Sequence, residues 1–391
     1  METPRTHDLL AIADLVRDGR ATSRGMIGRQ LGLRSTTVSD LVGQLVARDV
    51  LHESTLRSRS KGRPAAVLSF NAHRLGAVFV TVIDQTLVAC AVDLNLRVIG
   101  TLSAAPPHLS DNDALIAALR RLVADTAALF PPETELCAIV CSLSGLLDVP
   151  RSTWCVSSRW PNMRNLDLGQ ALAEFACRVW LIRNLDAELA GLRLYERHGA
   201  EETALLLHWG HGIGAAFAAG GDVVNRNRGR SCEIGHWRLG NGQNRQCTCG
   251  NTDCLETVAA LWSIGPKLAQ DFPGLPQSER EIAAHLGHAD LLDSTVVRKA
   301  LSEMLRLTAN LCRLLFPDRV ILTGPFVQNP DIFGRFVEAL SDAPILRSLD
   351  KVRVSVGDGH LAPEIAGALS EPFAQALADM VSCDGKVRPM P

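Results

Sequence analysis

The stretch CTCGNTDC, residues 247–254, places three thiols around a glycine within eight residues, and His236 lies eleven residues before Cys247. Three Cys and one His complete the tetrahedral shell of a structural Zn²⁺, which leaves no position for a catalytic water. The same thiols are also compatible with a disulfide or with unbound buried cysteines. We predict a structural zinc ion held by His236, Cys247, Cys249 and Cys254.

The remaining eight of the eleven cysteines are scattered, and those in apolar surroundings, such as Cys90, are expected to be small core residues. Met1–Arg5 is not followed by the apolar core of a secretory signal. No apolar run approaches the ~18 residues of a membrane span. The best candidate, Ala77–Val92, is interrupted by Asp84 and Gln85. We expect a cytoplasmic protein without membrane insertion, in a compartment where disulfides rarely persist.

Around the cysteine stretch, the chain from about residue 73 onward has an α/β pattern. Three β-rich runs with short turns are followed by helices that alternate with buried strands, which predicts two similar lobes and a ligand cleft between them. A helix is expected at Asp113–Leu129. The predicted strands are Ala77–Ile83, Leu87–Asp93, Arg97–Leu102, Leu136–Cys141, Val179–Arg183, Thr203–His208, Gly214–Ala219, Arg319–Thr323 and Val352–Val356.

The first 72 residues have a different pattern. Apolar residues at helical spacing predict three helices, the second capped by Thr22 or Ser23 and the third by Ser35 or Thr36. Only the short segment 32–34, which contains a glycine, separates the last two. Two helices joined by such a turn predict a helix-turn-helix.

The third helix is expected to enter the major groove, because its N-terminal residues are short hydrogen-bonding groups beside one arginine. Behind it, residues 57–64 (RSRSKGRP) carry four positive charges and no negative one, at the position of a wing tip. By itself this run is equally compatible with a solvated basic linker. The predicted DNA contacts are Arg34, Ser35, Thr36, Thr37, Ser39, Gln44, Arg57, Arg59, Lys61 and Arg63.

The net charge of −2 hides an asymmetry. Residues 1–64 contain 11 Lys/Arg and 7 Asp/Glu, whereas the rest contains 29 and 35. A basic head on an acidic body fits nucleic-acid binding at one end, although an excess of this size also arises by chance.

Three segments resemble the signature of the ROK family (repressors, open reading frames and kinases). They are Gly212-Ile213-Gly214, Glu233-Ile234-Gly235-His236 and Cys247-x-Cys249-Gly250-x-x-x-Cys254-Leu255-Glu256, in the family's order and spacing. The head resembles the repressor branch, since the family kinases usually lack it. The resemblance implies a winged helix-turn-helix (residues 1–72) and an actin-like, ribonuclease H-like body of the sugar-kinase type (73–391). Its small lobe would span about 73–185 plus the C-terminal helix, and its large lobe about 186–370.

The resemblance also implies residue roles. His236 and the three cysteines match the family's zinc ligands, and Glu233, His236 and Glu256 match residues that hydrogen-bond sugar hydroxyls. Carboxylates accept from vicinal hydroxyls, and a zinc-bound imidazole has its remaining N–H fixed as a donor. Asp186 matches the general base of the kinases. The alternative for Glu233 and Glu256 is a salt bridge that holds the zinc loop.

Two departures from the family pattern argue against kinase activity. The kinases have an Asp followed by a Gly-rich turn that approaches the ATP phosphates by its backbone, whereas this chain has Asp84-Gln85-Thr86. A later Gly-Gly phosphate turn is reduced to Thr323-Gly324-Pro325, where Pro325 removes a backbone donor. We therefore expect no ATP binding and a non-catalytic Asp186.

A further departure concerns the sugar. Leu185 stands where the family usually has a sugar-binding Asn, and Glu188 stands where it usually has a second Asn. A lost polar contact costs ~1–3 kcal/mol if the ligand hydroxyl stays unpaired. The chain is thus expected to bind a deoxy or altered sugar, to bind weakly, or to bind none.

The sequence favours a sugar-responsive repressor that binds a pseudo-palindromic double-stranded operator as a homodimer or homotetramer. A sugar kinase with a fused DNA-binding head is one alternative. The other is a repressor controlled by a protein partner, with a vestigial sugar pocket.

Overall fold

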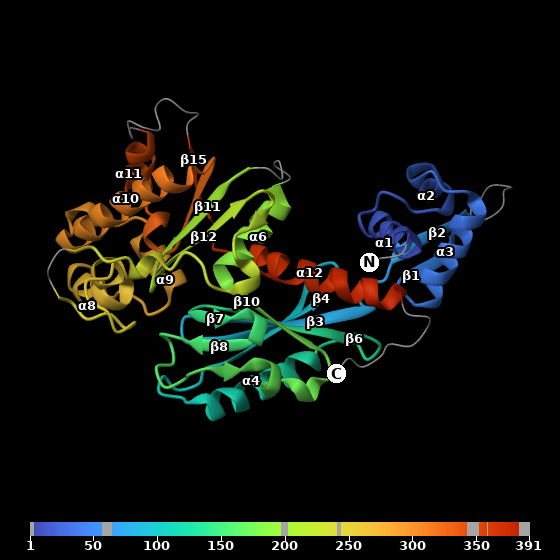
Figure 1. The fold of residues 1–391 in the computed structure, drawn as a ribbon, viewed down its shortest axis with the longest axis horizontal. Helices are drawn as coiled ribbons and strands as arrows, with labels where there is room; N and C mark the ends of the chain where they lie inside the picture. The colour runs from blue at the N-terminus through green and yellow to red at the C-terminus, as the bar shows by residue number, and fades with distance from the viewer. Residues whose placement is uncertain are drawn as a thin grey trace.

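The computed structural model describes residues 4–56, 65–196, 202–240, 244–341, 352–357 and 359–382. Two five-stranded sheets with their helices form the two lobes of the body, and the helices and hairpin of the head lie at one end (Figure 1). The predicted fold class, a winged helix-turn-helix ahead of a two-lobed α/β body, is confirmed. None of the helices in the described ranges is long and apolar enough to span a bilayer.

The head begins with α1 (Pro4–Arg17), α2 (Arg24–Leu31) and α3 (Ser35–Ala47). As predicted, Ser23 caps α2, because its side chain accepts from the Met26 N–H, and Gly32 ends the helix with a left-handed φ of 67°. The predicted cap of α3 is wrong. Arg34 is the N-cap, and its guanidinium makes no capping bond because it has donors only. Ser35 and Thr36 lie in the first helical turn.

An antiparallel hairpin follows α3 and forms the wing. β1 (Leu51–Leu56) pairs with β2 (Ala65–Phe70) in a register that sets Leu51 opposite Phe70. The buried side chains of Leu51 and Leu68 attach the hairpin to the helices. The basic run 57–64 lies outside the described residues, so the predicted contacts Arg57, Arg59, Lys61 and Arg63 are not placed.

The small lobe is built on a sheet of order β10-β6-β3-β4-β5, in which the three predicted β-rich runs form an antiparallel meander. Alternation along β3 gives the sheet two buried faces: Val78 and Val80 face α4, whereas Ala77 and Phe79 face α12. The elements are β3 (Leu75–Ile83), β4 (Thr86–Asp93), β5 (Val98–Ala104), α4 (Asn112–Ala127), β6 (Glu135–Leu143) and β10 (Arg178–Arg183). The helix α6 (Asn184–Glu196) follows β10 and packs on β11 and β12 of the large lobe.

A separate three-stranded sheet between β6 and β10 was not predicted. Its strands have two to four residues, too short for an alternating pattern to be recognised. Trp154 and Trp160 fill its core edge to face, with ring centroids 5.7 Å apart. The elements are β7 (Leu146–Asp148), β8 (Thr153–Val156), β9 (Leu166–Asp167) and α5 (Leu168–Ala171).

The large lobe has the strand order β13-β12-β11-β14-β15, with Trp209, Phe326 and Phe336 buried between the sheet and its helices. The strands are β11 (Ala204–Trp209), β12 (Ile213–Ala219), β13 (Asp222–Val223), β14 (Arg319–Thr323) and β15 (Arg353–Val356). The helices are α7 (Glu256–Ala259), α8 (Leu261–Asp271), α9 (Glu279–Leu286), α10 (Thr295–Leu315) and α11 (Pro330–Ser341).

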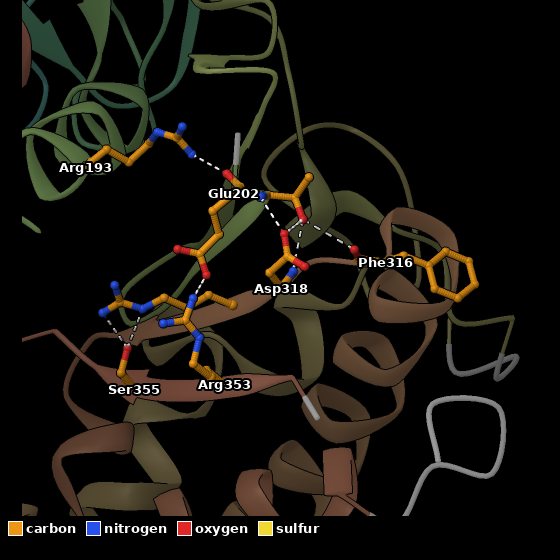
Figure 2. A network of polar contacts seen from close by, with 8 residues as sticks. Arg193, Glu202, Phe316, Asp318, Arg353 and Ser355 are labelled. Carbon is orange, nitrogen blue, oxygen red and sulfur yellow. Dashed lines mark hydrogen bonds and ion pairs between the residues drawn. The ribbon is translucent and has the colours of Figure 1, made fainter. Parts of the chain in front are cut away.

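Figure 2 shows the polar network at the start of the large-lobe strands. The Asp318 carboxylate accepts from the Thr203 N–H at 2.8 Å and from its hydroxyl at 2.7 Å. Glu202 forms an ion pair with Arg353, and its carbonyl accepts from Arg193 of α6 at 2.6 Å. These contacts join the beginnings of β11, β14 and β15 to α6 and so support the parallel pairings of the sheet.

The last helix, α12 (Leu361–Ser382), packs along α6 and β6 and then reaches α1 of the head (Figure 1). The crossing with α6 is so close that a Cβ on Gly191 or Gly367 would collide with backbone carbonyls of the other helix. At its far end the Ser382 hydroxyl lies 3.3 Å from the Thr6 hydroxyl. One helix therefore contacts both the element that carries Asp186 and the DNA-binding head.

Candidate metal centre and ligand site

The four predicted metal ligands come together, and we call them the zinc corner: His236, Cys247, Cys249 and Cys254. Their ligand atoms all lie within 4.8 Å of one another. Cys249 Sγ and Cys254 Sγ are 3.7 Å apart, far beyond a disulfide bond and close to the ~3.8 Å expected for two thiolates on one tetrahedral zinc. Cys247 Sγ is 3.6 Å from His236 Nδ1. The donor set and its geometry fit Zn²⁺ with no open coordination position.

A tight loop brings the three thiols to one side. The Cys247 carbonyl accepts from the Gly250 N–H at 3.0 Å, and Gly250 has a φ of 91°, which a side chain would strain. An isolated β-bridge between Arg238 and Cys254 joins the loop to the segment after His236, and a second, between Gln246 and Thr252, closes the loop on itself. The corner is thus held by its own backbone hydrogen bonds.

Glu256 begins α7 and is 8% exposed. One carboxylate oxygen accepts from the Ile213 N–H at 2.9 Å and the other from the Trp262 indole N–H at 3.1 Å. The alternative of a salt bridge to the zinc loop is not what the described residues show. Glu256 instead ties the zinc corner to the start of β12, with lone pairs left to accept from a ligand.

Arg183, which sequence reasoning missed, stands between two predicted site residues. Its Nε donates to Asp186 Oδ1 at 3.3 Å, and its Nη1 lies 3.6 Å from Glu233 Oε1. Two further donations go to the carbonyls of Ser231 and Ala215. A charged residue at the end of a buried strand was the signal available in the sequence.

The Asp186 and Glu233 carboxylates have the same electrostatic environment in kind. Burial raises the pKa of Asp186, and the nearby Arg183 guanidinium opposes that rise. Burial also raises the pKa of Glu233, again opposed by Arg183. Asp186 is fully buried, and its Oδ2 has no hydrogen-bond partner among the described residues. Oδ1, in contrast, accepts from Arg183.

Leu185 is 8% exposed and packs in an apolar cluster with Leu189, Leu206 and Ala216. Its Cδ1 would lie 2.8 Å from a Cβ on Gly214, so the two residues fit closely together. At this position, where the family resemblance implies a sugar-binding Asn, the side chain of Leu185 takes part in core packing.

The predicted DNA contacts within the described range lie on α3 and its N-cap, outside the buried face of the helix. Arg34, Ser35, Thr36, Thr37 and Ser39 are exposed, and Gln44 is partly exposed. The opposite face of α3 is buried through Val38, Leu41, Val42 and Leu45. Gln44 also donates to Asp40 at 3.1 Å, and Asp40 pairs with Arg5 of α1. α3 thus presents an unburied polar surface suited to a groove.

The comparison with protein families is decisive. The model of the ROK family matches residues 84–358, well over half of the chain. This chain belongs to the ROK family.

Transcriptional regulators and a sugar kinase are similar to it. The DNA-binding transcriptional dual regulator NagC of Escherichia coli K12 is 23% identical over 350 residues, which cover 86% of this chain and 85% of NagC. A solved ROK family transcriptional regulator, a homologue of the E. coli Mlc protein, superposes with a TM-score of 0.73 at 20% identity and covers 96% of this chain and 97% of that one. The ROK hexokinase of Thermus thermophilus has a TM-score of 0.56 at 22% identity, and it covers 75% of this chain and 97% of its own.

Proposed function

We propose that this ROK protein is a sugar-responsive transcriptional repressor with a structural zinc ion and no kinase activity, acting in the cytoplasm. The observation that carries the proposal is a winged helix-turn-helix with an exposed polar α3 joined to a ROK body. The similarity to solved and curated ROK regulators across almost the whole chain supports it. Residues 1–72 would be the DNA-binding domain, and 73–391 the ligand-binding and oligomerising body.

In this proposal, Zn²⁺ on the zinc corner positions His236, Glu233 and Glu256 for sugar hydroxyls, and Asp186 Oδ2 accepts a further one. The ion has a structural role only. Asp186 does not act as a base, because Arg183 holds one of its oxygens and the phosphate-binding turns of the kinases are altered. Exposed groups on α3, with the basic wing, would contact a two-fold operator as a homodimer or homotetramer.

DNA binding is tested by selection of the full chain against random double-stranded DNA. We expect a dyad-symmetric sequence to be enriched. Failure to enrich any sequence, with the protein folded and zinc-loaded, would remove the regulator assignment.

Sugar sensing is tested by a thermal-shift screen against aldoses, amino sugars and deoxy sugars, with Glu256→Ala as control. A ligand at 100 times its Kd adds about 2.7 kcal/mol to the stability of the state that it binds. The sugar that shifts the melting of the unmutated chain, and not that of the variant, should also change its affinity for the selected DNA.

Two observations favour the partner-controlled alternative over the kinase: Leu185 is packed in the core, and Arg183 already pairs with Asp186 and Glu233. A sugar screen without any shift, combined with specific DNA binding, would select that alternative. Sugar-dependent ATP hydrolysis that Asp186→Asn abolishes would instead establish a kinase.

A further inference from the structure

The carboxylate of Glu279, the first residue of α9, lies in the turn between β11 and β12. Its Oε1 accepts from the His211 backbone N–H at 2.6 Å, and its Oε2 is 3.2 Å from His208 Nε2. A Cβ on Gly210 would collide with the same carboxylate, so the turn fits tightly around it. Burial by itself raises the pKa of Glu279. The His208 charge and the hydrogen bonds lower that pKa by more than burial raises it, so the carboxylate stays ionised.

The same residue also reaches the small lobe. Its backbone N–H donates to Asp84 Oδ1 at 3.1 Å, at the turn between β3 and β4. The Arg159 Nη2, from the segment between β8 and β9, lies 3.7 Å from Glu279 Oε1. Glu279 therefore contacts both lobes. We call Asp84, Arg159, His208, His211 and Glu279 the Glu279 cluster.

Both turns that correspond to phosphate loops of the ROK kinases meet this cluster. Asp84 belongs to the first turn. In the second turn, the Thr323 hydroxyl lies 3.1 Å from His208 Nδ1. Gly324, with a φ of 101°, leaves no room for a Cβ beside the Trp209 carbonyl. The Glu279 carboxylate thus lies where the two turns meet. The groups around it are of the kinds that bind phosphate: a backbone N–H, an imidazole and a guanidinium.

We propose that Glu279 is a specificity-determining residue that takes the place of a ligand phosphate, joins the two lobes and restricts the cleft to ligands without a phosphoryl group. A phosphate would meet a fixed negative charge and occupied donors there. This deepens the proposed function, on which it rests, by assigning the effector to unphosphorylated sugars.

The test is anion rescue of the full chain with Glu279→Ala, followed by thermal unfolding. Inorganic phosphate and pyrophosphate are the probes, in buffers matched for ionic strength with sodium chloride. We expect the variant to melt several degrees lower and to regain stability saturably with either anion. The unmutated chain and Glu281→Ala, an exposed glutamate on the same helix, should not respond.

Two outcomes would overturn the inference: a Glu279→Ala variant that melts like the unmutated chain, or an unmutated chain that pyrophosphate stabilises as strongly as the variant. If Glu279→Ala does not fold, Glu279→Gln takes its place, because the amide keeps the acceptor for the His211 N–H and removes the charge. Pyrophosphate should then stabilise Glu279→Gln measurably more than the unmutated chain, and equal responses would refute the role of the charge. These readouts use neither DNA nor sugar, so their failure is distinguishable from failure of the proposed function.

Discussion

The zinc corner brings metal-binding side chains together, and the Glu279 cluster brings charged side chains together. The two sites differ in how far apart in the sequence their residues lie. The zinc ligands come from one stretch, residues 236–254, whose own turns and β-bridges bring them together. The members of the Glu279 cluster come from four separate segments of two lobes. A locally closed site should tolerate changes elsewhere in the fold, whereas a dispersed one depends on how the lobes meet.

The largest effect is expected at the zinc corner. Cys249→Ser removes one of the four ligands, so it should lose about one zinc ion per chain and several kcal/mol of stability. Elemental analysis and thermal unfolding measure the two losses. Cys155→Ser, outside the corner, should keep its zinc. An unmutated protein without zinc would contradict the prediction.

Glu256→Ala should have the next largest effect, because it leaves the Ile213 N–H and the Trp262 indole N–H without their acceptor. We expect a loss of about 2 kcal/mol in unfolding free energy, with the zinc content unchanged. Denaturant unfolding with parallel metal analysis tests whether the zinc corner keeps its metal without the contacts of Glu256. Zinc loss in this variant would show that the corner depends on its attachment to β12. Glu256→Gln, which keeps one acceptor oxygen, is the matched control.

A third carboxyl sharpens the contrast, because no ion pair joins Glu364 to a cation among the described residues, whereas Arg159 and His208 lie beside Glu279. Glu364 accepts from the Thr81 and Ser142 hydroxyls at 2.9 and 2.6 Å, and burial, reinforced by the nearby Glu188, raises its pKa to about 8. The folded state therefore holds a proton that the unfolded state has released between about pH 4.5 and 8.

Stability should consequently fall as the pH rises through this window, and Glu364→Gln, which stays neutral, should flatten the fall. Unfolding free energies at pH 5, 6.5 and 8 measure the slope for both chains. An unchanged slope in the variant would mean that Glu364 is ionised in the folded protein.

Arg34→Ala should have the smallest effect on stability, because Arg34 is exposed and lies outside both regions. The body should melt unchanged, while affinity for the selected DNA should weaken by ~1–3 kcal/mol if Arg34 reads a base. Fluorescence anisotropy at several salt concentrations makes the measurement. Affinity equal to that of the unmutated chain would remove Arg34 from the contact set.

The sequence by itself determined the features that depend on neighbouring residues. Helical spacing and the short glycine turn predicted the helix-turn-helix, β-rich runs bounded by short turns or helices predicted the long strands of both sheets, and the spacing of three thiols predicted the zinc corner. Each of these is closed by local hydrogen bonds or a local pattern, so composition and spacing are sufficient. The three short strands β7–β9 were missed because two to four residues carry no period.

Only the tertiary structure decided what depends on the meeting of distant segments. It paired Arg183 with Asp186 and Glu233, set Glu279 between the lobes, and brought α12 from the crossing with α6 to the head. The energy of a buried charge is set by the groups that surround it in space, and those groups come from segments far apart in the chain. A glutamate at position 279 is therefore an ordinary helix-start residue in the sequence and becomes an interlobe anion only when both lobes have folded.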